Sequence, residues 1–237
     1  MTVRERLILA LDRPDRESAL ALAKRAGSYM GAYKVGLELI TAIGPGILEE
    51  LSRDGGRVFL DAKFHDIPNT VAGACRAAVK HGVWMLNVHA SGGRAMLMAA
   101  AEAVLQESTA ADTPPPILLA VTILTSLDRD LLNETLGVKE APGSLALRMS
   151  RLTQDCGLDG VVASAQEAAA IREACGEDFV IVTPGARRAG SPNHDQKRVM
   201  TPANALAAGA DYLVIGRDVT ASPDPAAAAR DLLQELR

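Results

Sequence analysis

Eight short apolar runs recur along the chain, and helix-like segments separate most of them. The runs are Leu7–Leu11, Tyr33–Gly36, Arg57–Leu60, Trp84–Val88, Ile117–Val121, Gly160–Ala163, Phe179–Val182 and Tyr212–Ile215. Short, nearly continuous apolar runs are typical of strands in a parallel sheet that is covered on both faces. The segments between them predict helices at Asp15–Ala26, Thr70–Lys80, Gly93–Leu105, Ala165–Ala174, Pro202–Ala208 and Pro225–Leu236. Strands that alternate with helices indicate βαβ units.

The chain length narrows the fold class. A chain of 237 residues has the size of a compact (β/α)8 barrel, the TIM barrel. No Pro/Ser-rich linker divides it, so we expect a single domain over residues 1–237. A doubly wound parallel sheet is the alternative fold.

Charge and composition exclude several classes of function. The net charge is −4 with both signs interspersed, whereas a nucleic-acid surface shows clustered Lys and Arg. No apolar run reaches the length of about 18 residues that a membrane span needs, and Leu7–Leu11 is too short for a signal peptide. Cys75, Cys156 and Cys175 form no CxxC pair, so we expect no disulfide framework and a cytoplasmic location. Neither GxGxxG nor GxxxxGK[ST] occurs, which leaves dinucleotide and P-loop binding unsupported.

Polar residues follow most of the predicted strands at the same end. They are Asp12, Asp61 with Lys63, His89, Thr125 with Ser126, Thr183-Pro184-Gly185 and Gly216-Arg217. In (β/α)8 barrels the carboxyl ends of the strands carry the active site. This pattern predicts an enzyme.

Asp61, Lys63 and Asp66 form the first candidate cluster. Strand alternation places Asp61 and Lys63 on one side, and Asp66 follows in the next loop. Two carboxylates near one ammonium raise the pKa of the lysine, which suits a positioned acid better than a Schiff base. Two alternatives remain open: a solvated run of surface ion pairs, and a metal site that also uses His65.

Lys34 lies inside the second apolar run, where a charge is costly unless it is paired. Asp12 and Asp61, at the ends of the neighbouring strands, are its natural partners. The lysine is therefore either half of a structural ion pair or part of a cluster Asp12–Lys34–Asp61–Lys63. His89 is likewise either a structural histidine or a member of the site.

Two glycine–arginine segments follow the seventh and eighth runs: Pro184-Gly185-Ala186-Arg187 and Ile215-Gly216-Arg217. The loops at these positions commonly bind phosphate in barrels. Glycine lets backbone N–H groups approach an anion, and arginine offers a planar fork to its oxygens. Solvated arginines in structural turns are the alternative, and Arg188 could take the role of Arg187.

Taken together, these motifs resemble the orotidine 5′-phosphate decarboxylase family, in its short bacterial type. The segment Asp61-Ala62-Lys63-Phe64-His65-Asp66-Ile67-Pro68-Asn69-Thr70 is similar to the family signature. The rest of the pattern occurs in order along the chain: Leu9-Ala10-Leu11-Asp12, Lys34-Val35-Gly36, Val121-Thr122-Ile123-Leu124-Thr125-Ser126, Thr183-Pro184-Gly185-Ala186-Arg187, Gln196 and Ile215-Gly216-Arg217. Arg188 departs from it, because proline is more common there.

The resemblance implies a homodimeric (β/α)8 barrel that converts orotidine 5′-phosphate to UMP in pyrimidine biosynthesis without a metal or organic cofactor. It implies that Lys63 protonates C6 of the pyrimidine within an array of Lys34, Asp61 and Asp66, the last from the partner subunit. The substrate-binding residues that it implies are Asp12, Lys34, Asp66, Ile67, Thr70 (also from the partner), Thr125, Ser126, Pro184, Arg187, Gln196, Gly216 and Arg217.

Two other functions remain open. A Mg2+-dependent sugar-phosphate decarboxylase or aldolase of the same superfamily would use Asp61 and Asp66 around the metal. A barrel without catalytic activity could instead bind a phosphorylated metabolite.

Overall fold

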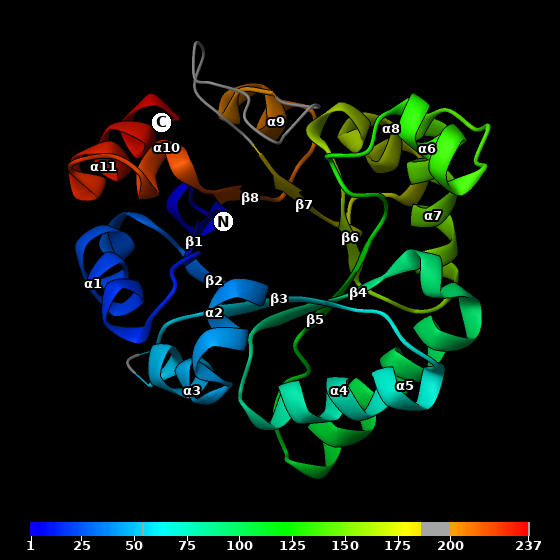
Figure 1. Ribbon diagram of the computed structural model, residues 1–237, viewed down its shortest axis with the longest axis horizontal. Coiled ribbons are helices and arrows are strands. Elements are labelled where there is room, and N and C mark those ends of the chain that lie inside the picture. Colours follow the sequence, from blue (N-terminus) through cyan, green and yellow to red (C-terminus); the bar gives the residue numbers. More distant parts are fainter. Residues whose placement is uncertain (54, 186–199, 237) are drawn as a thin grey trace.

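The structure, a computed structural model, describes residues 1–53, 55–185 and 200–236, and its strands form one closed parallel barrel (Figure 1). Each strand pairs with the next along the chain, and β8 closes the barrel against β1. The strands are β1 (Leu7–Ala10), β2 (Ala32–Gly36), β3 (Val58–Phe64), β4 (Met85–His89), β5 (Ile117–Val121), β6 (Gly160–Val162), β7 (Val180–Pro184) and β8 (Tyr212–Ile215). The (β/α)8 prediction is confirmed, and the doubly wound alternative is wrong.

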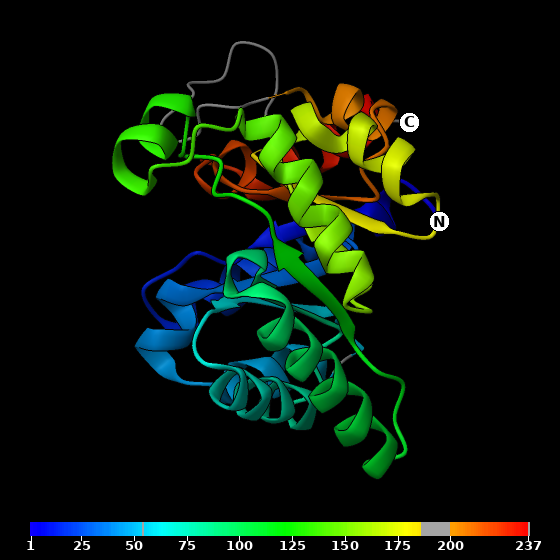
Figure 2. The same ribbon diagram turned by 90° about the vertical axis from the view of Figure 1, so that its right-hand side faces the viewer.

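Helices surround the barrel on its outside (Figures 1 and 2). They are α1 (Arg16–Ala26), α2 (Leu37–Ile43), α3 (Gly46–Ser52), α4 (Pro68–Lys80), α5 (Gly93–Ala110), α6 (Arg129–Leu136), α7 (Pro142–Asp155), α8 (Ala165–Cys175), α9 (Pro202–Ala207), α10 (Arg217–Thr220) and α11 (Pro225–Glu235). The six predicted helices are confirmed, whereas α2, α3, α6, α7 and α10 were not predicted. No helix of the described residues is both long enough and apolar enough to cross a membrane.

Apolar side chains fill the inside of the barrel. This inner layer consists of Ile8, Ala10, Ala32, Phe59, Met85, Leu119, Val121, Val162, Val182, Tyr212 and Val214. Trp84, next to the start of β4, packs edge-on against Tyr212 at 5.2 Å, and the Arg57 guanidinium lies 4.5 Å from the Trp84 ring centre. The interior is thus a packed core, and the polar residues are left at the carboxyl ends of the strands.

β3 is longer than its apolar run predicted. Asp61 and Lys63 lie inside this strand instead of after it. The register against β4 shifts there, because Leu60 pairs with Leu86 and Phe64 pairs with Val88. Three residues of β3 therefore lie opposite one residue of β4, which is a β-bulge. His89, predicted to follow the fourth strand, is its last residue.

Candidate active site

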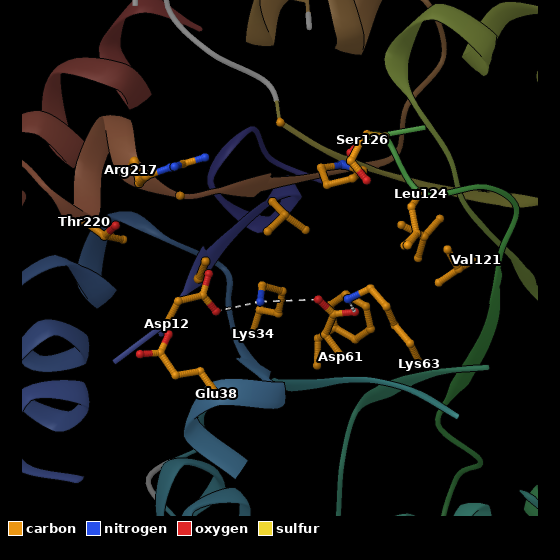
Figure 3. A pocket seen from close by; sticks show the side chains of 18 of the residues that line it. Asp12, Lys34, Glu38, Asp61, Lys63, Val121, Leu124, Ser126, Arg217 and Thr220 are labelled. Carbon is orange, nitrogen blue, oxygen red and sulfur yellow. Dashed lines mark hydrogen bonds and ion pairs between the residues drawn. The ribbon is translucent and has the colours of Figure 1, made fainter. Parts of the chain in front are cut away.

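A cavity of about 570 Å³ opens at the carboxyl ends of the strands (Figure 3). Nine of the predicted site residues line it: Asp12, Lys34, Asp61, Lys63, Thr125, Ser126, Pro184, Gly216 and Arg217. They come from β2, β3 and β7 and from the segments that follow β1, β5 and β8. The fold thus gathers side chains that are far apart in the sequence around one concave site.

Asp12, Lys34, Asp61 and Lys63 form a chain of alternating charges, here called the charged array (Figure 3). Lys34 Nζ lies 2.9 Å from Asp12 Oδ1 and 3.3 Å from Asp61 Oδ2. Lys63 Nζ lies 2.7 Å from Asp61 Oδ1. Asp61 is buried and the Lys63 side chain is 28% exposed, so the alternative of a solvated surface run does not describe these two residues, whereas Asp66 is exposed. The four-residue cluster, not an isolated ion pair, is the arrangement that forms.

Neighbouring charges outweigh the cost of burial in this array. Burial opposes the charge of Lys34, but the carboxylates of Asp61 and Asp12 raise the pKa of Lys34 above 10.5. Burial likewise opposes the charge of Asp61, but Lys34 and Lys63 lower the pKa of Asp61 below 3.8. The charge of Asp61 therefore contributes to folding stability until the pH falls through the lowered pKa of Asp61. The charge of Lys34 contributes until the pH rises through the raised pKa of Lys34. Both residues stay charged across the neutral range.

Gly36, at the end of β2, leaves room for the array. A Cβ atom at this position would lie 2.8 Å from Lys34 Nζ and 3.1 Å from Asp12 Oδ1. A larger residue would therefore push the ammonium away from its carboxylate. This close approach explains the glycine that follows the buried lysine.

Arg217, one of the residues predicted to hold phosphate, lies across the cavity from Lys63. Arg217 begins α10 directly after β8, and Figure 3 shows it on the side of the cavity opposite Lys63. Gly216 and Gly185 line the same cavity, and Gly185 has the positive φ of 74° that favours glycine. The other predicted residues of this region, Arg187, Gln196 and the alternative Arg188, lie outside the described residues.

Asp66, Ile67 and Thr70 do not line the cavity of their own chain, as far as its described lining shows. They are exposed around the beginning of α4, and Asp66 Oδ1 accepts a hydrogen bond from the Ile67 backbone N–H at 2.6 Å. Asp61 and Asp66 were both expected beside the Lys63 ammonium. Within one chain, only Asp61 contacts it among the described residues.

His65 and His89 lie beside one another, with ring centres 5.5 Å apart. Burial, aided by the neighbouring His65 and Lys63, lowers the pKa of His89 below 6.5, which favours its neutral form near pH 7. Within the described ranges, no group of three or more His, Cys, Asp and Glu side chains is placed to hold a metal ion.

Several residues of the site were not singled out from the sequence. Arg13, Glu38, Ile123, Leu124 and Thr220 also line the cavity. Asn87, in β4, lies behind it and donates a hydrogen bond to Asp61 at 2.7 Å. A polar residue inside an apolar strand run is the signal that marked Lys34, and it could have marked Asn87 too.

Comparison with known proteins extends the similarity over the whole chain. The sequence model described as "Orotidine 5'-phosphate decarboxylase / HUMPS family" matches residues 5–232. A protein of Moorella thermoacetica named orotidine 5′-phosphate decarboxylase is 56% identical over 236 residues, which cover 100% of this chain and 94% of that protein. A protein of Chromobacterium violaceum with the same name is 53% identical, over 97% of this chain and 91% of its own length.

Solved structures agree with this similarity. The crystal structure of orotidine 5′-phosphate decarboxylase from Lactobacillus acidophilus superimposes with a TM-score of 0.84 at 33% identity, and the match covers 98% of each chain. An uncharacterized conserved protein from Geobacillus kaustophilus superimposes with a TM-score of 0.83 at 37% identity, over 98% of this chain and 100% of that one.

Proposed function

Because the chain belongs to the orotidine 5′-phosphate decarboxylase / HUMPS family, we propose that it converts orotidine 5′-phosphate to UMP in pyrimidine biosynthesis. The observation that carries this proposal is the charged array, which faces a cavity with Arg217 on its opposite side. A nucleotide bound across this cavity would place its base near Lys63 and its phosphate near Arg217.

The cavity lining suggests how the substrate is held. Arg217 and the backbone of Gly216 would bind the phosphate, with Pro184 beside them. Asp12 and Lys34 would meet the ribose hydroxyls. Thr125 and Ser126 would bind the polar edge of the pyrimidine, since a hydroxyl can both donate and accept hydrogen bonds. Arg187 and Gln196 would add contacts to the phosphate and the base.

The array would act by electrostatics. As the bond between C6 and the carboxylate breaks, CO2 leaves and the electron pair stays on C6. The Lys63 ammonium would stabilise this charge and then donate its proton to C6, and solvent would reprotonate the amine. Asp61 near the substrate carboxylate would disfavour the bound ground state.

A single ion pair is too weak for this reaction. Decarboxylation without an electron sink needs about 20 kcal/mol of barrier lowering, near the top of the range for enzymes. Binding energy from the distant phosphate, through Arg217, would therefore contribute by ordering the array around the pyrimidine.

We further propose that a second copy of the chain completes the site. Asp66, Ile67 and Thr70 are exposed, and the Ile67 side chain is 68% exposed although it is apolar. Met98 and Leu105 are exposed apolar residues of α5, which packs beside α4 (Figures 1 and 2). An interface over this region would bring Asp66 and Thr70 to the partner's cavity.

Mixing two inactive variants tests the shared site. We expect Lys63→Ala and Asp66→Ala chains to be nearly inactive alone. Mixed under conditions that exchange subunits, they should regain activity, because each hybrid dimer holds one site with both native residues. At equal amounts, half of the dimers are hybrids with one intact site each, so about one quarter of wild-type activity is expected from statistical exchange. No recovery in exchanged dimers would contradict a shared site.

The function itself is tested by substrate and metal dependence. The purified chain, treated with EDTA, should consume orotidine 5′-phosphate, as followed by its ultraviolet absorbance. It should not act on ketopentose or ketohexose phosphates with added Mg2+. Activity on the sugar phosphates alone would favour the Mg2+-dependent enzyme, and binding of UMP without any turnover would favour the non-catalytic barrel.

A further inference from the structure

Asn87 lies in the middle of β4 with its side chain directed at β3. It is fully buried and is not among the described residues that line the cavity. Its Oδ1 accepts a hydrogen bond from the backbone N–H of Lys63 at 2.7 Å, and its Nδ2 donates one to Asp61 Oδ1 at 2.7 Å. One buried amide thus contacts two members of the charged array.

The bulge in β3 explains why a side chain takes this place. Asp61, Ala62 and Lys63 lie opposite Asn87 alone, so the regular ladder of backbone hydrogen bonds is interrupted. Lys63 has a φ of 52°, a conformation that residues with a Cβ atom adopt rarely. The side-chain carbonyl of Asn87 accepts a hydrogen bond from the Lys63 backbone N–H, which the bulge turns away from the strand ladder. This hydrogen bond holds the Lys63 backbone in its positive-φ conformation.

Chemistry fixes the orientation of the amide. A backbone N–H can only donate, so the oxygen of Asn87 must face Lys63. The ionised carboxylate of Asp61 can only accept, so the nitrogen must face Asp61. Leucine, of similar size, could make neither bond, and an ionised aspartate would repel Asp61.

The contacts close a ring. Asp61 Oδ1 accepts from Asn87 Nδ2 and from Lys63 Nζ, each at 2.7 Å, while the Lys63 backbone is held by the same amide. Asp61 Oδ2 is left to face Lys34 at 3.3 Å. Asn87 therefore sets the rotation of the Asp61 carboxylate between its two ammonium partners. It also sets the point from which the Lys63 side chain reaches the cavity.

We propose that Asn87 is a positioning residue that holds Asp61 and Lys63 in the arrangement needed for decarboxylation. The inference rests on the proposed function. Asn87 acts through these two residues, so its loss should slow the chemical step more than it weakens nucleotide binding.

The Asn87→Leu variant removes both hydrogen bonds at nearly constant volume. We expect kcat for orotidine 5′-phosphate to fall about 10- to 100-fold at every pH between 5 and 9, since small misplacements of reacting groups cost this much. The Kd for UMP should change by no more than about threefold, because ground-state binding is largely kept. Asn133→Leu and Asn133→Asp, on the exposed face of α6, are the matched controls for the two variants at position 87 and should behave as wild type.

The Asn87→Asp variant separates positioning from a purely structural role. Its protonated carboxyl has a carbonyl oxygen for Lys63 and an O–H for Asp61, whereas its ionised form repels Asp61. We expect activity to be restored toward low pH and to fall as the new group ionises. The charged groups nearby are Asp61, Lys63, Lys34 and the pair His65–His89. These groups are also present in wild type, Asn87→Leu and Asn133→Asp. A fall in kcat with rising pH that occurs only in Asn87→Asp would therefore come from ionisation of the new carboxyl group at position 87.

Wild-type kcat in Asn87→Leu would overturn the inference. So would a parallel loss of UMP binding and kcat in Asn87→Leu together with an unchanged pH profile in Asn87→Asp, which would mark Asn87 as structural only. Failure of the wild-type chain to consume orotidine 5′-phosphate would instead overturn the proposed function, before any variant is compared.

Discussion

Replacing Lys63 by alanine should lower kcat for orotidine 5′-phosphate by about 10⁴-fold or more. Under the proposed mechanism, the variant would lose the acid that protonates C6, which is worth about 10²- to 10⁴-fold, and the nearest positive charge to the carbanion, worth about 10²- to 10³-fold. Nucleotide binding should remain measurable, because Arg217 and Asp12 still line the cavity. Steady-state turnover and UMP binding by calorimetry measure the two effects separately.

The fold should survive this change. Asp61 keeps Lys34 at 3.3 Å and the Asn87 amide at 2.7 Å, so its charge is not left without a partner. Lys24→Ala, on the exposed face of α1, removes a lysine that is not among the described cavity-lining residues and is the matched control. Turnover of Lys63→Ala within tenfold of wild type would rule out Lys63 as the acid.

Replacing Arg217 by alanine should distinguish phosphate binding from catalysis. Loss of a charged hydrogen bond to phosphate costs about 1.5–3 kcal/mol, so kcat/KM for the nucleotide should fall roughly 10- to 150-fold. Turnover of orotidine, the nucleoside without phosphate, should be nearly unchanged, because it offers Arg217 no phosphate oxygen. Both rates come from the same absorbance assay.

Arg230→Ala on α11 is the control for Arg217→Ala, since Arg230 is a half-exposed arginine that pairs with Asp231. It should leave both rates as in wild type. Equal losses on nucleotide and nucleoside in Arg217→Ala would mean that Arg217 supports the structure of the site and does not bind phosphate.

The barrel could be predicted from the sequence because its signals are local. Each strand is a short apolar run, and a buried parallel strand needs no information from distant residues to be recognised. Lys34 was informative for the same reason, since a charge inside such a run requires partners. The strand ends then predicted which side chains meet at the cavity.

The bulge of β3 could not be predicted in this way. The segment Asp61-Ala62-Lys63 contains no glycine or proline to mark it, yet Lys63 has a positive φ. The bulge depends on the pairing of β3 with β4, and Asn87 is its partner 24 residues further along the chain. Asp61 and Lys63 do share one side, as expected, but the bulge contributes to this arrangement and regular alternation alone does not account for it.

The proposed contacts between chains and the short helices were the other limits to prediction from the sequence. Asp66 and Thr70 do not line their own chain's described cavity, so spacing along one chain wrongly placed Asp66 beside Lys63 of the same chain, and only the family resemblance indicated a partner's site. The short helices α2 and α3 escaped prediction because Gly44 and Pro45 separate two segments of about two turns each.

The fate of C6 in heavy water tests the central claim most directly. The EDTA-treated wild-type chain should convert orotidine 5′-phosphate in D2O to UMP and CO2 in equal amounts. The UMP should carry one deuterium at C6, as read by NMR and mass spectrometry, because in the proposed mechanism the Lys63 ammonium would exchange with solvent before it donates. Unchanged orotidine 5′-phosphate after prolonged incubation, or UMP formed without deuterium at C6, would contradict the account.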